Sequence, residues 1–377
     1  MKQWLKWHRG MLFWAILYTS LLAQEGYRDN HSCSECHSEI YEEYQSSFHA
    51  KGYFNDALHR DIANRVSQTK YTCAYCHMPM ADNLKSLVTG QARPNPQNPT
   101  HTDAISCYFC HTIAYVKKAH HWNENILSKQ AKGYKPTLYG TLQEPEKNTK
   151  HSSVHNPLYT KQVCIGCHGH KRNENNVTLF WSGSKQEGSL GCIKCHMPLV
   201  SGGAEKMNKA LRTHHRSHHF LGIHDKTFRK KGVKMELTLE GRVLAVTLEN
   251  KMGHPLIIQP ARAKFVGVRL LREKKVIWTN HADDPIQNAQ GYFSIDFEKA
   301  HQAVILPNHA TSKEEHNLQA KEKRVLHYTL PPLKRGDEIE VGLYLFLAKP
   351  QCATLLEPQT RHLMEPESIK ISHLKVK

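Results

Sequence analysis

The segment Cys33-Ser-Glu-Cys-His37 places two cysteines three positions apart, with a histidine directly after the second. The same pattern occurs five times before residue 200, as Cys33/Cys36/His37, Cys73/Cys76/His77, Cys107/Cys110/His111, Cys164/Cys167/His168 and Cys192/Cys195/His196. Two thiols at this spacing can bond to one porphyrin edge while the adjacent imidazole binds the iron, which is the attachment signature of a c-type haem. The sequence therefore predicts five covalently bound haem c groups, held by these residues.

Two other chemistries use closely spaced cysteines. A zinc site needs two Cys-x-x-Cys pairs brought together and has no need of a histidine directly after each pair. Disulfides within the motifs would close small, strained rings, which are typical of redox dithiols. The repeated histidine favours haem over both. The odd cysteine, Cys352, is expected to be a small buried apolar residue, with a free thiol or an intermolecular link as alternatives.

The N-terminus has the order of a secretory signal. Lys2, Lys6 and Arg9 precede an apolar run over residues 11–23, and a polar segment follows. This run is short for a membrane span of about 20 residues, so we expect a signal peptide over residues 1–23, cleaved after Ala23. Leu21 is not the small residue preferred three positions before cleavage, which leaves an uncleaved anchor as the alternative. Haem attachment of this type occurs outside the cytoplasm, so the sequence predicts a periplasmic protein.

The net charge of +17 raises the question of nucleic acid binding. Residues 24–224 hold 23 Lys+Arg and 16 Asp+Glu, an excess that the propionates of five haems can neutralise. Residues 225–377 hold 25 basic and 18 acidic residues without haems to offset them. We therefore expect no nucleic acid partner. The C-terminal half has either an ordinary solvated basic surface or a preference for an acidic partner or an anionic membrane surface.

The chain divides at about residue 225. About 40 residues per haem leave no room for a conventional core, so residues 27–230 are expected to form short helices and loops around closely packed haems. A helix is predicted over residues 35–50. After the division, seven strand-like runs are bounded by turn signals, which predicts an antiparallel β-sandwich over residues 233–350, followed by a less regular tail over residues 351–377. The runs are 233–239, 243–249, 265–271, 276–279, 292–297, 324–330 and 339–347.

Histidines are the candidates for both axial positions of each iron. The motif residues His37, His77, His111, His168 and His196 are the expected proximal ligands. Residues 24–224 hold 14 further histidines, an excess that favours irons with two histidine ligands and low potential. The preferred distal candidates are His49, His101, His155 and His218. The competing candidates are His59, His120, His121, His151, His170, His214, His215, His219 and His224. Met78 and Met197, next to motif histidines, are expected to pack rather than to ligate.

The segment from Cys33 to Ala50 resembles the first haem segment of bacterial multihaem cytochromes c, the superfamily of hydroxylamine oxidoreductase, pentahaem nitrite reductase and the tetrahaem electron carriers. Residues 105–112, 192–198 and 217–222 are similar to other recurrent pieces, and residues 250–255 resemble the opening of a sandwich that follows the haems in some members. The resemblance implies that His49 and His218 are distal ligands. All five motifs end in histidine, whereas the nitrite reductase has lysine at its catalytic haem, so the resemblance implies no catalytic site.

These observations lead to two functional hypotheses. The first is a periplasmic pentahaem protein that carries electrons between a quinol-linked donor and a terminal reductase. The alternative is a multihaem oxidoreductase in which one haem lacks a sixth protein ligand and acts on a small nitrogen or sulfur oxyanion. The sandwich is expected to dock the haem-bearing part to a redox partner or a membrane, which is compatible with both.

Overall fold

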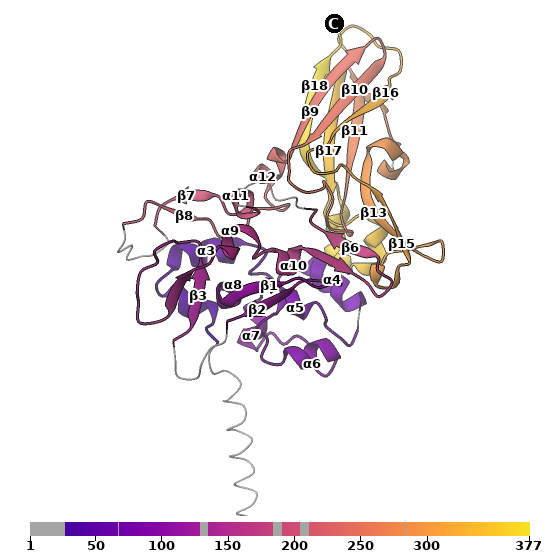
Figure 1. The fold of residues 1–377 in the computed structure, drawn as a ribbon. Helices are drawn as coiled ribbons and strands as arrows, with labels where there is room; N and C mark the ends of the chain where they lie inside the picture. The colour runs from indigo at the N-terminus through magenta and orange to yellow at the C-terminus, as the bar shows by residue number, and fades with distance from the viewer. Residues whose placement is uncertain (1–26, 67, 129–134, 184–190, 204–210, 283) are drawn as a thin grey trace, which may run out of the picture.

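The computed structural model describes residues 27–66, 68–128, 135–183, 191–203, 211–282 and 284–377. The predicted signal peptide, residues 1–23, lies outside this range. Figure 1 shows two parts: an N-terminal part of short helices and small hairpins, and a tall sandwich that stands on one end of it. Nowhere in the described ranges is there a helix with the length and apolar character needed to cross a membrane.

The N-terminal part, residues 27–231, is built from short helices. The longest of those described is α4, with 10 residues. The helices are α2 (Asn30–Ser34), α3 (Ser38–Ser46), α4 (Ala57–Val66), α5 (Ala74–His77), α6 (Leu84–Thr89), α7 (Pro99–Thr102), α8 (Cys107–Thr112), α9 (Leu158–Lys161), α10 (Ile165–His168), α11 (Ile193–His196) and α12 (Lys226–Lys231). The predicted helix over residues 35–50 is shorter in the structure, because His37 has a non-helical backbone and caps α3.

Four two-stranded sheets complete the N-terminal part. They pair β1 (Ile113–Lys117) with β2 (Glu124–Leu127), β3 (Thr137–Gly140) with β4 (Ser152–His155), β5 (His170–Arg172) with β6 (Thr178–Trp181), and β7 (Leu199–Ser201) with β8 (His214–Arg216). The β3–β4 pair is parallel and the other three are antiparallel. These sheets are too small to enclose a core of their own.

The sandwich is antiparallel, as predicted, with its strands in two sheets. The smaller sheet has the order β16 (Lys323–Thr329), β10 (Val243–Asn250), β9 (Val233–Glu240). The larger runs β14 (Gln302–Val304), β13 (Tyr292–Lys299), β11 (Ala263–Arg272), β17 (Glu338–Phe346), β18 (Glu367–Lys375), with β12 (Lys275–Thr279) on β11 and β15 (Ser312–His316) on β13. The connections contain the 3₁₀ turns η2 (Pro285–Gln287), η3 (Ala289–Gly291), η4 (Pro307–His309), η5 (Pro350–Leu355) and η6 (Pro358–Met364).

Alternating side chains explain the sandwich. In β10, Leu244, Val246 and Leu248 are fully buried, and the residues between them are more exposed. A strand with this period of two presents one apolar face, and two such sheets bury their faces against each other. Among its described residues, the N-terminal part has a small apolar cluster around Tyr71, Met78 and Leu87. Its remaining interior is a cavity, described below.

The prediction that the sandwich ends at residue 350 is wrong. Residues 367–375 form β18, which pairs along its length with β17 and so belongs to the larger sheet. The alternation in this segment is weak because the apolar Ile371 is exposed, the polar Lys370 is half-buried, and Ile369 is the one buried residue of the strand. Cys352 is buried, 2% exposed, in an apolar cluster below the sandwich, as expected.

Replacing Leu343 by alanine should lower the free energy of unfolding of the sandwich by about 2–5 kcal/mol, because the side chain is fully buried in the central strand β17 and leaves a cavity. The control is Val276→Ala on β12, where the side chain is 50% exposed and the loss should stay below about 0.5 kcal/mol. Urea unfolding followed by circular dichroism measures both. Equal losses would contradict the assignment of Leu343 to a close-packed core.

Candidate functional site

Each Cys-x-x-Cys-His motif forms one helical turn. The N–H of the histidine donates to the carbonyl of the first cysteine in four of them, at 3.0 Å for His37, 2.9 Å for His77, 2.8 Å for His168 and 3.0 Å for His196. In the third motif the turn lies inside α8, which Ser106 caps through its side chain. One turn brings both thiols and the imidazole to the same side of the backbone. No disulfide joins any of the cysteines in the described residues, so the motif cysteines are available for haem attachment.

Thiols of different motifs meet. Cys33 hydrogen-bonds Cys107, which lowers the pKa of Cys33 and raises that of Cys107. Cys76 contacts Cys167 in the same way, which lowers the pKa of Cys76 to about 6. In the third contact, Cys164 lowers the pKa of Cys192 to about 7. The first motif is therefore adjacent to the third, and the fourth is adjacent to both the second and the fifth.

A buried polar network fixes the first of these contacts. The side-chain oxygen of Asn30 accepts from the Cys107 N–H at 2.8 Å, and its amide donates to the Tyr44 hydroxyl and the Asp103 carbonyl, both at 3.1 Å. Asn30 is 3% exposed, so these bonds are protected from water. The helix that carries the first motif is thus bonded directly to the start of the third.

Four motif histidines each face a second histidine ring. The ring centres are 6.3 Å apart for His37 and His151, 6.0 Å for His168 and His49, 6.3 Å for His111 and His218, and 6.3 Å for His196 and His254. A metal–imidazole bond is about 2 Å and the ring centre lies about 1 Å behind its nitrogen, so two rings on opposite sides of one metal have centres roughly 6 Å apart. The four separations match this value.

Hydrogen bonds leave one nitrogen of these rings free. Nδ1 donates to a backbone carbonyl in His111 (Tyr139, 2.6 Å), His196 (Leu221, 2.5 Å), His218 (Arg216, 2.8 Å) and His254 (Pro255, 2.8 Å). When Nδ1 carries the proton, Nε2 keeps its lone pair for a metal, which is the usual arrangement of ligating histidines. Burial lowers the pKa of His49 and His218 to about 3 and that of His168 to about 4, so these rings are neutral and able to ligate.

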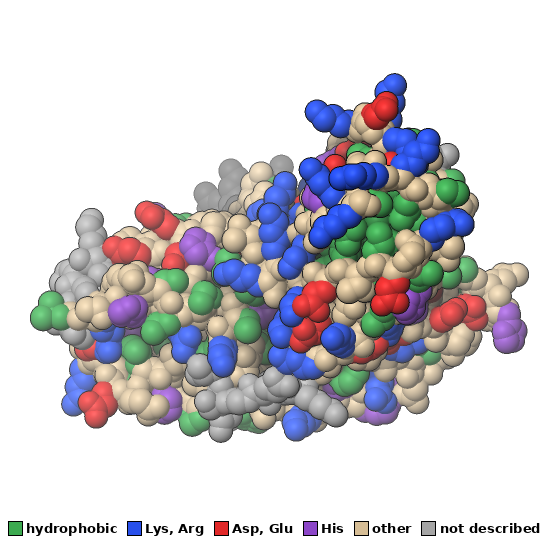
Figure 2. All heavy atoms as spheres, turned by 90° about the horizontal axis from the view of Figure 1, so that it is seen from above, with side chains coloured by type: hydrophobic (Ala, Val, Ile, Leu, Met, Phe, Trp, Pro, Cys, Tyr) green, Lys and Arg blue, Asp and Glu red, His purple; other side chains and the backbone are tan. Residues whose placement is uncertain are grey.

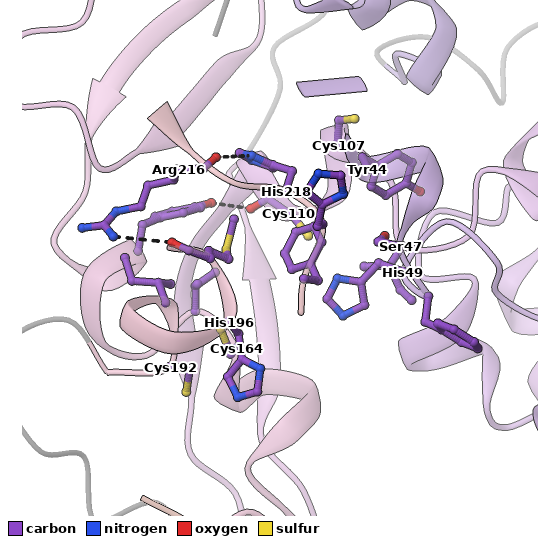
Figure 3. Close-up of a pocket in the computed structure, with 18 of the residues that line it drawn as sticks. Tyr44, Ser47, His49, Cys107, Cys110, Cys164, Cys192, His196, Arg216 and His218 are labelled. Carbon is purple, nitrogen blue, oxygen red and sulfur yellow. Dashed lines mark hydrogen bonds between the residues drawn. The ribbon is translucent and has the colours of Figure 1, made fainter. Parts of the chain in front are cut away.

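A single connected cavity of about 1910 Å³ runs between the motifs. This is roughly twice the upper end of the 300–1,000 Å³ range of ordinary ligand pockets. Figure 3 shows Cys107, Cys110, Cys164 and Cys192 around this space, together with His49, His196 and His218. The Nδ1 atom of His49 is buried there without a hydrogen-bond partner. Thiols, neutral imidazoles and apolar side chains around so large a space fit several covalently attached porphyrins.

Cys195 is placed differently from Cys192, the other cysteine of the fifth motif. Its side chain is exposed and lies outside the lining of the cavity, whereas Cys192 and His196 of the same motif belong to that lining. Three positions of a helix turn through about 300°, so the two thiols lie about 60° apart around the helix axis, and Cys192 is the one turned toward Cys164. Haem attachment through Cys195 therefore stays a prediction, and it would place that edge of the fifth haem at the surface.

Cys73 is the other motif cysteine outside the lining of the cavity. Unlike Cys195, it is partly buried, and it packs against the small apolar cluster around Tyr71, Met78 and Leu87. Burial raises the pKa of its thiol. The second motif therefore presents only Cys76 and His77 to the shared space.

The predicted distal candidates separate into two groups. His49 and His218 face motif histidines across the cavity. His101 does not: its Nε2 bonds the Asn83 side chain at 2.8 Å and its Nδ1 accepts from the Asn95 N–H at 3.0 Å, so both nitrogens are used. His155 lies on β4, outside the lining of the cavity, and makes no ring contact with a motif histidine in the described part of the chain.

Two facing histidines were not among the preferred candidates. His151 was a competitor, and its Nδ1 lies 3.1 Å from the Ser153 hydroxyl. His254 lies in the loop that opens the sandwich, C-terminal to the residues in which distal ligands were expected. The signal that could have found it is the segment Asn250-Lys-Met-Gly-His-Pro255, which the resemblance already singled out. Here Asn250 donates its amide to the His254 carbonyl at 2.9 Å and so shapes the loop.

The second motif differs from the others. The ring of His77 stacks on His59 with centres 3.7 Å apart, which leaves no room for an iron between them. The Nε2 atom of His59 lies 2.9 Å from the Tyr71 hydroxyl. Burial lowers the pKa of His77 well below its usual value and that of His59 to about 4. No other histidine makes a ring contact with His77 in the residues described.

Glu43 of α3 holds the segment that carries His218. Its carboxylate accepts from the His218 backbone N–H at 2.7 Å and lies 3.2 Å from Nε2 of His215. The interaction positions the His218 ring over the cavity from the side of the first motif.

Comparisons with known proteins agree with this arrangement. Residues 32–112 match the family model described as cytochrome c554 and c-prime. A search of curated proteins found no significant match. The crystal structure of a penta-haem cytochrome c552 from Thermochromatium tepidum aligns with a TM-score of 0.73 at 22% identity, over 93% of this chain and 99% of that one. A superoxide reductase aligns over 30% of this chain and 76% of its own at 10% identity, with a TM-score of 0.14 that bears no conclusion.

The two informative matches cover different features of the chain. The family model covers the first three haem motifs, and the solved structure shares the fold of both parts. They support covalently bound haem c, as the motifs predict. The match over the first three motifs and the shared fold agree with the resemblance to multihaem cytochromes c noted from the sequence.

Proposed function

We propose that this chain is a pentahaem electron-transfer protein in which at least four irons have two histidine ligands. The observation that carries the proposal is the set of four imidazole pairs with ring centres 6.0–6.3 Å apart. Two histidine ligands leave no open position on the iron and favour low potential, which suits electron transfer rather than substrate binding. Haem c, when bound, supplies one-electron exchange between ferric and ferrous iron.

The chain's own residues would hold each haem in a defined place. The motif cysteines and His37, His77, His111, His168 and His196 provide attachment and proximal ligands. The distal ligands would be His151 for the first haem, His218 for the third, His49 for the fourth and His254 for the fifth. This assignment replaces His101 and His155, whose rings do not face a motif histidine.

The contacts between thiols support a continuous path. The first motif touches the third, and the fourth touches the second and the fifth. The Cys110 thiol is close enough to Cys164 and Cys167 to raise the pKa of both, which joins the third motif to the fourth. The order is therefore first, third, fourth, fifth, with the second as a branch at the fourth. Electrons would enter and leave at the ends of this path.

The partners and compartment that we propose follow from sequence and charge. The signal-like N-terminus supports a periplasmic location, where a quinol-linked donor and a terminal reductase are suitable partners. Figure 2 shows Lys and Arg side chains gathered over the sandwich in the face seen from above. The 25 basic and 18 acidic residues of 225–377 favour a partner with an acidic surface.

A second candidate function rests on the second motif. Because His59 and His77 are stacked at 3.7 Å, no ring is held at the distance that two ligands of one iron require. The second haem would then have His77 as its single protein ligand and an open face. Lys171, which lies close enough to lower the pKa of His77, would draw a small nitrogen or sulfur oxyanion toward it. The chain would in that case be an oxidoreductase with four haems as its electron supply.

Replacing His218 by alanine should convert one low-spin haem to high-spin in the ferric holoprotein, because the third iron loses its second ligand. Electron paramagnetic resonance measures the change. The matched control is His101→Ala, which removes a buried histidine that is hydrogen-bonded at both nitrogens and should leave the low-spin signals unchanged. An unchanged spectrum for His218→Ala, or a new high-spin signal in the control, would refute the assignment.

The wild-type holoprotein should show one high-spin haem that binds cyanide, and His59→Ala should leave that signal in place, because Nε2 of His59 is engaged by Tyr71. The same spectroscopy, with a cyanide titration, tests this. A fully low-spin wild type that gains a high-spin haem in His59→Ala would mean that the two rings separate and both bind iron. The oxidoreductase function would then be excluded, and the electron-transfer function would extend to all five haems.

A further inference from the structure

A group of basic side chains lies where the sandwich meets the cavity. The cavity beside the fifth motif is lined by Arg262, directly before β11, by Lys264, the second residue of β11, and by Arg229 of α12. Lys264 is 6% exposed and Arg229 7% exposed. Buried cations are costly unless an opposite charge accompanies them. These cations therefore require negative charges nearby.

The carboxylates within reach do not balance the group. Arg229 is paired with Glu367 at 2.6 Å. Lys264 has no carboxylate within 4 Å among the described residues, and it donates only to the Leu256 carbonyl, at 2.5 Å. Within the described part of the chain, the Arg262 side chain makes one hydrogen bond, with Nε2 of His224 at 3.3 Å, and Asp56 lies near it without forming an ion pair. Of these two cations, only Arg262 is influenced by a carboxylate, that of Asp56, and the two form no ion pair.

The pKa values of Lys264 and Arg262 are both lowered, as expected for buried cations without a paired negative charge. Burial, followed by the nearby Arg262 and Arg229, lowers the pKa of Lys264 to about 7. Burial lowers the pKa of Arg262 to about 10, although Asp56 acts in the opposite direction. An anion in the cavity would reverse both effects. The remaining ammonium protons of Lys264 and the guanidinium of Arg262 are suited to carboxylate oxygens.

The same lysine is bonded to the loop that carries His254. Its acceptor, the Leu256 carbonyl, is two residues beyond His254, and Asn250 holds the other side of that loop. The ring that faces His196 and the unbalanced cations therefore belong to one small unit of the sandwich. An anion bound by Lys264 and Arg262 would lie next to a haem held between His196 and His254.

We propose that Lys264 and Arg262 form a carboxylate site for a propionate of the fifth haem. The sandwich would then hold that haem at two points, by an imidazole on the iron and by two cations on the porphyrin edge. The inference rests on the proposed haem function. It assigns to the sandwich a role in setting the potential of one haem, in addition to any docking role. A free carboxylate from solution has the same chemistry and is the alternative source.

The test is a redox titration of the five-haem holoprotein, followed optically. Lys264→Gln keeps a donor for Leu256 but removes the charge, and should lower the midpoint potential of one haem while the other four stay unchanged. A nearby positive charge favours the ferrous state, so its loss lowers the potential. Lys264→Arg should restore the wild-type value. The control is Lys275→Gln on β12, an exposed lysine of the same sheet, which should change nothing.

Two further measurements keep the outcomes distinct. His254→Met should raise the potential of the fifth haem, and the haem that it shifts must be the one that Lys264→Gln lowers. If Lys264→Gln does not fold, Arg262→Gln takes its place with the same expectation. Unchanged potentials in both charge variants, or a shift of a different haem, would overturn the inference. Fewer than five haems by mass spectrometry of the wild type would instead refute the proposed pentahaem function.

Acetate, added to the wild type at constant ionic strength, separates the two sources of carboxylate. A propionate already in the site predicts no saturable dependence of any potential on acetate concentration. A saturable shift of the fifth haem that disappears in Lys264→Gln would overturn the assignment to propionate and identify a site for free carboxylates.

Discussion

The pairing of buried imidazoles across a shared cavity is the constraint on which the N-terminal part depends. Three of the four pairs join residues more than 100 positions apart in the chain: His37 with His151, His49 with His168 and His111 with His218. With few apolar side chains of its own to bury, this part has little else to hold distant segments together. An iron bound between two such rings would act as a long-range cross-link, and its binding would contribute directly to the free energy of folding.

The sandwich is stabilised in a different way from the N-terminal part. Its two sheets are held by alternating apolar residues, and its core is complete without any cofactor. It nevertheless takes part in the site, because the loop between β10 and β11 carries both His254 and Arg262, and the second residue of β11 is Lys264. The fifth site is therefore formed jointly by the N-terminal part, which depends on a cofactor for its interior, and by the sandwich, which does not.

The elements that the sequence predicted well are those governed by local rules. The five motifs and the seven predicted strand runs follow from spacing and alternation, and each run coincides with a strand of the structure. The β18 strand was missed because pairing with β17, rather than its own pattern, makes it a strand. Which histidine faces a motif histidine is a tertiary property: the ring of His101 is hydrogen-bonded to Asn83 and Asn95, whereas the facing rings of His151 and His254 come from loops. No local spacing encodes that choice.

The small parallel sheet of β3 and β4 has a consequence for assembly. The Tyr139 carbonyl on β3 orients His111, and His151 immediately precedes β4, where it faces His37. One two-stranded unit therefore serves the third motif on one strand and the first motif on the other. The two sites can reach their final geometry only when this unit has formed, so maturation of the first and third haems should be a single cooperative event rather than two independent ones.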